Sequence, residues 1–237
     1  MAGWPGRQRT GEAEVEMVRM AFRDECARLE EVLRGLDEAD LDRPTPCPPW
    51  AVRDLLAHVR TGVGRLVDML AAPAPQRAEV DAATYFGTAK FTPEVDSARI
   101  DSARREARAL PGVREVADGF ARAWRATDAA VAAQPPGRLV RTRHGDPMTL
   151  TEFLRTRVVE VGVHGLDLAD ALARQPWLTP TAAEVVADLL SDGRPVPDGL
   201  GWDPLTLVRK ATGRAALTDR ERTLVERADF RWLSFSG

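Results

Sequence analysis

The chain has 237 residues and a mass of 26.0 kDa, enough for one large domain or one domain with an appendage, and 44% hydrophobic residues can build a core. Its 33 basic and 36 acidic residues give a net charge of −3, so the composition offers no basic surface for nucleic acid or an anionic membrane. The composition therefore favours a globular protein that acts on a small-molecule substrate.

The N-terminal sequence MAGWPGRQRTGEAEVEM lacks the apolar segment of a signal peptide, and no stretch approaches the roughly 18 consecutive apolar residues of a membrane span. We therefore expect a cytoplasmic protein. Cys26 and Cys47 are too few for a disulfide framework or a thiolate zinc site, and reduced thiols are expected.

Four long helices are predicted from apolar residues that recur with a period of 3.6. The first covers residues 12–36, and the second covers residues 51–72, after the proline-rich connector DRPTPCPPW. The third runs from Pro111 to the proline pair that follows Gln134. The fourth begins at TLTE, where Thr149 and Glu152 form a capping-box pattern, and ends near Leu172.

The segments between and after these helices are less regular. Residues 73–98 predict a long, partly helical crossover, followed by a short helix from Ser97 to Leu110. GRLVRTRHGDPMTL predicts a short β-hairpin that turns at His144, Gly145 and Asp146. Beyond Gln175, residues 179–193 and 203–213 predict two more helices, and FRWLSF is a candidate strand.

Four main helices with one long crossover predict a mainly α-helical fold, a four-helix bundle over residues 1–174 with a helical C-terminal extension over residues 175–237. Bundles of this kind build metal sites in their cores from side chains on facing helices. The second and fourth helices are therefore the place to look for a site.

The stretch RVVEVGVHGLDLADAL in the fourth helix carries Glu160 and His164 four positions apart. Such a pair lies on one helical face about 6 Å apart, a spacing that suits two ligands of one ion. His58, among apolar residues of the second helix, is the best third ligand, and His144 in its polar turn is the rival. E-x-x-x-H pairs also arise by chance, but a carboxylate on an apolar face is costly to bury unless it is paired or bound to an ion.

Three motifs in this order resemble the mycothiol-dependent maleylpyruvate isomerase family, within the DinB-like superfamily of metal-binding four-helix bundles. They are RPTPCPPWAVRDLLAHV, LRTRVVEVGVHGLDLADAL and WDPLTLVRKATGRAALTDRER, and the resemblance spans roughly residues 15 to 225. It implies a divalent metal, zinc in the type enzyme, held by His58, Glu160 and His164.

The chain departs from the family pattern in two places. Family members often have a threonine where this chain has Ala51, and without that hydroxyl the capping box with Asp54 is expected to be lost, at about 1 kcal/mol. The type isomerase also has a C-terminal α/β domain, for which the tail of this chain is expected to be too short.

Zinc with three protein ligands keeps one coordination position open, where it could hold a thiol cofactor as a nucleophilic thiolate. Addition of that thiolate to an electron-poor alkene supports either cis–trans isomerisation or thiol transfer. Asp167 could orient His164, and Arg157 could meet an anionic substrate or cofactor, although both also suit structural roles on the helix. Cys47, between prolines, is interpreted as a packed small residue.

Three functions remain open from the sequence. The first is a metal-dependent isomerase or transferase with mycothiol as co-substrate. Lysine occurs only at Lys90 and Lys210 and asparagine is absent, a composition typical of the high-GC bacteria among which mycothiol producers are found. The second is a hydrolase or lyase that uses a metal-bound water, and the third is a non-catalytic metal or small-ligand binding module. Monomer and homodimer both remain possible.

Overall fold

The structure is a computed structural model that describes residues 11–86, 93–110 and 112–233. In chain order its elements are α1 (Gly11–Arg34), the 3-10 turn η1 (Asp40–Asp42), α2 (Val52–Ala71), α3 (Ala82–Tyr85), α4 (Pro93–Arg108), α5 (Val113–Ala132), β1 (Leu139–Arg141), β2 (Pro147–Thr149), α6 (Leu150–Ala171), α7 (Pro180–Ser191), α8 (Pro204–Ala211) and α9 (Asp219–Arg227).

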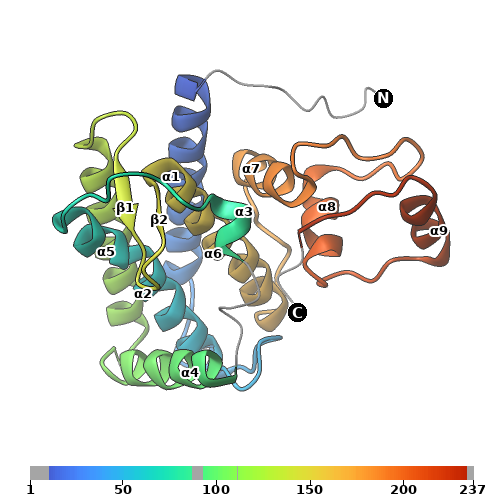
Figure 1. Cartoon of the computed structure of the whole chain (residues 1–237). Helices are drawn as coiled ribbons and strands as arrows, with labels where there is room; N and C mark the ends of the chain where they lie inside the picture. Colours follow the sequence, from blue (N-terminus) through green and yellow to red (C-terminus); the bar gives the residue numbers. More distant parts are fainter. Residues whose placement is uncertain (1–10, 87–92, 111, 234–237) are drawn as a thin grey trace.

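Helices α1, α2, α5 and α6 form a four-helix bundle in which α1 and α2 each pack against both α5 and α6 (Figure 1). Their apolar faces meet in one core, because an amphipathic helix becomes stable in water when it buries its apolar stripe. The core includes the fully buried side chains of Phe22, Leu29, Leu55, Phe120 and Leu166. The predicted mainly α-helical fold is confirmed. Among the described helices, none has both the length and the apolar character that a bilayer span requires.

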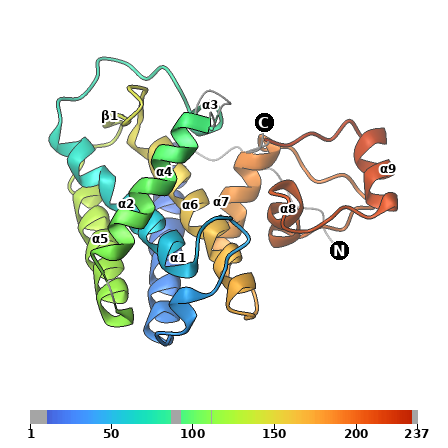
Figure 2. The same ribbon diagram turned by 90° about the horizontal axis from the view of Figure 1, so that it is seen from below.

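The crossover between α2 and α5 contains the short α3 and the longer α4. Helix α4 crosses α2 and packs against it, which closes one side of the bundle (Figure 2). The helix that was predicted from Ser97 is present but begins earlier, at Pro93. Part of the predicted crossover, residues 87–92, lies outside the described residues.

The predicted β-hairpin is confirmed, with β1 and β2 antiparallel and Val140 paired with Met148. The capping box predicted for α6 is only half formed. The Thr149 hydroxyl accepts a hydrogen bond from the Glu152 amide, but the Glu152 carboxylate accepts from the backbone amide of Ala82 instead of returning to Thr149. Glu152 thus ties α6 to the start of α3.

The start of α2 keeps more of its cap than the sequence suggested. The Asp54 carboxylate accepts a hydrogen bond from the backbone amide of Ala51 at 3.1 Å, so the acidic half of the capping box survives without the hydroxyl half. The expectation that Ala51 abolishes this capping box was therefore wrong for the Asp54 side.

The C-terminal part begins with α7, which packs against α1 and α6, while α8 and α9 lie beside the bundle (Figures 1 and 2). Helix α9 was not predicted, although Thr218 and Glu221 form a complete capping box at its start. The candidate strand FRWLSF was wrong over residues 230–233, which are irregular, and its last two residues lie outside the described part of the chain.

Candidate metal centre

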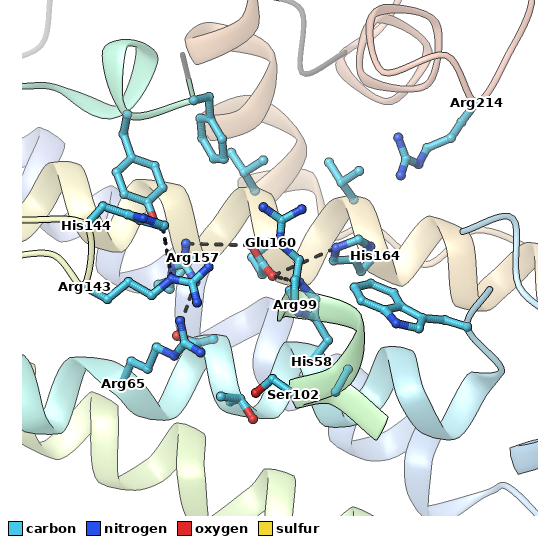
Figure 3. Close-up of a pocket in the computed structure, with 18 residues that line it drawn as sticks. His58, Arg65, Arg99, Ser102, Arg143, His144, Arg157, Glu160, His164 and Arg214 are labelled. Carbon is cyan, nitrogen blue, oxygen red and sulfur yellow. Dashed lines mark hydrogen bonds and ion pairs between the residues drawn. The ribbon is translucent and has the colours of Figure 1, made fainter. Parts of the chain in front are cut away.

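Helices α2 and α6 bring three potential metal ligands together. The Nε2 atom of His58 lies 2.6 Å from Oε1 of Glu160, and Nε2 of His164 lies 4.0 Å from the same oxygen. The three ligand atoms lie within 4.8 Å of one another, and Figure 3 shows the side chains converging on one point. These are the three residues that the sequence predicts as ligands, and the structure places them in one cluster.

Local geometry explains this convergence. Glu160 and His164 are one helical turn apart on α6 and share the face that meets α2. On α2, Gly62 has no side chain, and a Cβ atom there would lie 3.4 Å from Oε1 of Glu160 and 3.0 Å from Nη1 of Arg157. Gly62 therefore lets the carboxylate and the guanidinium approach the backbone of α2.

The electrostatics of the cluster favour the protonation states that a metal ion requires. Burial alone would raise the pKa of Glu160, but the neighbouring His58 and Arg157 hold it well below its ordinary value. Burial lowers the pKa of His58, against the opposing effect of Glu160. At neutral pH the site therefore offers a carboxylate and a neutral imidazole, as metal ligation needs.

A second layer of polar contacts fixes His164. Its Nδ1 atom lies 2.9 Å from Oδ2 of Asp167, which is buried. Burial would raise the pKa of Asp167, but hydrogen bonds from His164 and Arg214 hold it well below its ordinary value. Since an ionised carboxylate only accepts, Nδ1 of His164 carries a hydrogen, and Nε2 is the ring nitrogen that faces Glu160.

Cys47 lies beside this second layer and not in the ligand cluster. Its Sγ atom donates to Oδ2 of Asp167 at 3.2 Å. Burial and the Asp167 charge raise the pKa of the Cys47 thiol to about 12, so it remains protonated at neutral pH. Cys47, His164 and Asp167 could also be grouped as metal ligands, but Arg214 already engages both oxygens of Asp167. The cluster of His58, Glu160 and His164 is therefore the better candidate metal site.

Arg157 and His144 are the two remaining residues that the sequence singled out for the site, and both lie near the ligand cluster. Arg157 is buried, with Nη2 3.7 Å from Oε2 of Glu160 and Nη1 donating to the carbonyl of Gly62. His144 lies on the turn of the hairpin, where its Nε2 accepts from Nε of Arg143. His144 is not part of either cluster of potential ligands found in the described chain.

The candidate ligands form one wall of a cavity of about 250 Å³ (Figure 3). The indole of Trp50 packs on the imidazole of His58, with ring centroids 4.7 Å apart. Five arginines line the cavity, and among its described lining residues Glu160 is the single carboxylate. The arginines are Arg65, Arg99, Arg143, Arg157 and Arg214.

Sequence reasoning did not single out Trp50 or four of these arginines. Trp50 and Arg214 both lie inside the motifs that carry the family resemblance, and this position in the motifs is the one sequence feature that could have indicated them as site residues. Arg65, Arg99 and Arg143 come from α2, α4 and the hairpin turn, and only the packing of the chain brings them to one cavity.

The residues present fit a divalent ion such as zinc. Two imidazole nitrogens and one carboxylate oxygen are ligands that zinc prefers, and three protein ligands leave a position open for another molecule. The second-layer contact from Asp167 to His164 is also the arrangement that commonly orients a metal-bound histidine.

Comparison with known proteins identifies one family and two similar structures. A family model described as "Mycothiol maleylpyruvate isomerase N-terminal domain" matches residues 22–169. Among curated proteins no significant match was found. The crystal structure of the mycothiol-dependent maleylpyruvate isomerase is 17% identical with a TM-score of 0.53, and covers 91% of this chain and 93% of that chain. A histidine-to-alanine mutant of the mycothiol-dependent maleylpyruvate isomerase is 16% identical with a TM-score of 0.55.

At this identity the two structures show a shared fold. Because the alignment covers similarly large shares of both chains, 91% and 93%, the two chains have nearly the same length. The tail of this chain is therefore not markedly shorter than the corresponding part of that structure, contrary to the expectation from sequence.

Proposed function

Because the chain belongs to the mycothiol maleylpyruvate isomerase N-terminal domain family, we propose that it is a divalent-metal-dependent enzyme with mycothiol as its co-substrate. Its reaction is isomerisation of a small electrophile or transfer of the thiol to it. The observation that carries the proposal is the convergence of His58, Glu160 and His164 at the wall of the cavity. Zinc is the expected ion.

His58, Glu160 and His164 would hold the ion, which would lower the pKa of a bound thiol so that a nucleophilic thiolate is present at neutral pH. Asp167 fixes the ring of His164 through Nδ1 and so keeps Nε2 directed into the cluster. Trp50 covers the imidazole of His58 and limits the access of water on that side.

The thiolate would attack the electron-poor carbon of the substrate, and the electron pair of the double bond would move toward its electron-withdrawing group. Rotation about the resulting single bond and expulsion of the thiolate would give the other geometric isomer. Protonation of the adduct would instead give a thiol conjugate. Arg157 borders the cavity beside Glu160 and could stabilise the negative charge that develops on the electrophile.

The test is thiol binding to the cobalt-substituted protein. Mycothiol should produce an intense thiolate-to-cobalt charge-transfer band, and turnover of a substrate, with maleylpyruvate assayed first, should require both metal and thiol. If saturating mycothiol leaves the spectrum unchanged and a substrate turns over equally well without thiol, the thiol-dependent function is wrong and a hydrolase or lyase takes its place. Retention of metal with no turnover of any electrophile would favour a binding module.

A further inference from the structure

The cavity has a positively charged end beside the candidate metal centre. Arg65 of α2, Arg143 of the hairpin turn and Arg157 of α6 lie together there, next to His58 and Glu160 (Figure 3). These side chains come from three separate elements, so the positive charge is not a run of basic residues along one helix surface.

The cluster has little compensating charge of its own. Within residues 11–86, 93–110 and 112–233, Arg65 and Arg143 form no ion pair with a carboxylate, and Arg157 approaches only Glu160, at 3.7 Å. Glu160 is already within 2.6 Å of His58 and belongs to the candidate ligand set. The positive end of the cavity therefore has an excess of cationic groups.

Without a bound anion, this excess of positive charge is electrostatically unfavourable. Burial lowers the pKa of Arg65, and the charge of Arg157 lowers it further. Partial desolvation at the cavity wall and the charge of Arg65 likewise lower the pKa of Arg143, although much of this residue is exposed to solvent. Burial and like-charge repulsion both oppose the cationic forms, so an anion between these groups would offset an existing cost.

Two of the three arginines, Arg157 and Arg143, already have contacts that hold them in place before any ligand arrives. Arg157 donates from Nη1 to the carbonyl of Gly62, and its guanidinium lies 4.9 Å from the ring centre of Phe153. Arg143 donates from Nε to Nε2 of His144, a contact that does not use its two terminal nitrogens. Guanidinium groups fixed in this way lose little conformational freedom when they bind an oxyanion. Their planar geometry also matches the oxygens of a carboxylate or a phosphate.

We propose that Arg65, Arg143 and Arg157 form an anion subsite that determines substrate specificity by binding a carboxylate or phosphate group of the electrophile. The anionic group would lie at this end of the cavity, and the electron-poor carbon would face His58, Glu160 and His164. The assignment of the bound anion as the electrophile rests on the proposed function, whereas the anion subsite itself does not.

The test is isothermal titration calorimetry with inorganic phosphate and, separately, with succinate. Both anions are titrated into the purified protein and into Arg65→Gln and Arg143→Gln, with Arg122→Gln, an exposed change on α5 outside the cavity, as the matched control. We expect at least one anion to bind, with about tenfold or weaker affinity in each pocket variant and unchanged affinity in the control. The anion that binds more tightly identifies the substrate group as phosphate or carboxylate.

The metal content of the same samples separates this inference from the proposed function. Arginine-dependent anion binding in a protein that binds no metal supports the subsite and overturns the metal-dependent function. Metal binding together with no anion binding, or with equal anion binding in all four proteins, overturns the subsite alone. Because each substitution removes one member of a like-charged group, Arg65→Gln and Arg143→Gln should melt no lower than the original protein, and phosphate or succinate should raise their melting temperatures less.

Discussion

Arg214 holds both carboxylate oxygens of Asp167, with Nε 2.8 Å from Oδ1 and Nη2 2.7 Å from Oδ2. Arg214 follows α8, in the C-terminal part of the chain, whereas Asp167 lies on α6 one turn beyond His164. A paired contact of this kind fixes both the position and the orientation of the carboxylate. The C-terminal part thus sets the orientation of a candidate metal ligand in the bundle.

Loss of this contact should weaken metal binding without unfolding the bundle. We expect Arg214→Gln and Asp167→Asn each to lower the affinity for zinc about 10- to 100-fold. Arg214→Gln removes the contact that fixes the Asp167 carboxylate, and Asp167→Asn removes the carboxylate that orients the ring of His164. Competition against a chromophoric zinc chelator measures the effect. Arg222→Gln, an exposed change in α9, is the control, and equal affinity in all the variants would contradict a positioning role for Arg214 and Asp167.

The ligand assignment predicts a specific pattern of metal loss. The purified protein is expected to hold one divalent ion, and His58→Ala, Glu160→Ala and His164→Ala should each remove most of it, because two remaining ligands bind an ion weakly. His144→Ala should leave the metal content unchanged. Elemental analysis after reconstitution measures the metal content of each variant. Loss of metal in His144→Ala alone would contradict the assignment and indicate a site at the hairpin instead.

Gly62 should matter for the site more than for the fold. In Gly62→Ala the new methyl group would lie 3.0 Å from Nη1 of Arg157 and 3.4 Å from Oε1 of Glu160, so one of these side chains must move. Alanine also favours a helix over glycine by about 1 kcal/mol. We expect unchanged or higher thermal stability with weaker metal binding, measured by calorimetry and zinc competition. The nearby Gly64→Ala is the control, since its Cβ would meet a side chain only at 3.7 Å, and equal metal affinity in both variants would refute this role of Gly62.

The ligand cluster was predictable from sequence because its signals are local. Glu160 and His164 share a helical face through their spacing alone, and His58 stands out as a histidine among the apolar residues of an amphipathic helix. The family resemblance then supported the same choice. The bundle could be predicted for a similar reason, since apolar periodicity over some twenty residues is a strong signal.

The rest of the site depends on tertiary packing. Arg214 is 47 positions from Asp167, and it reaches that carboxylate only because the turn after α8, with Gly213 at a φ of +75°, docks beside α6. The charged end of the cavity likewise needs α2, α6 and the hairpin turn to meet. Contacts between such distant segments cannot be predicted from the spacing of residues within one segment.

Glu25 should make the stability of the fold depend on pH. It is fully buried on α1, where its Oε2 accepts hydrogen bonds from the amide and hydroxyl of Thr179 at the start of α7, both at 2.8 Å. Its Oε1 atom has no hydrogen-bond partner in the described structure. Burial raises the pKa of Glu25 to about 7, while Thr179 and Arg28 lower it and Asp24 raises it.

The sign of the effect follows from the proton uptake of the two states. Between its ordinary pKa of 4.5 and its folded pKa of about 7, Glu25 binds more protons in the folded protein than in the unfolded chain. The free energy of unfolding should therefore fall as the pH rises through this range, by on the order of 3 kcal/mol from this residue, with the loss complete above pH 7. A neutral glutamine cannot ionise and should remove this contribution.

Urea unfolding at pH 5 and pH 8 measures the difference. We expect the free energy of unfolding of Glu25→Gln, relative to the original protein, to rise by on the order of 3 kcal/mol from pH 5 to pH 8, since the other titrating groups cancel in the comparison. Glu31→Gln, an exposed change on the same helix, should show no such rise. Parallel pH profiles for the original protein and Glu25→Gln would mean that Glu25 keeps the same charge in both states. The α1 contact with the start of α7 would then be independent of pH in this range.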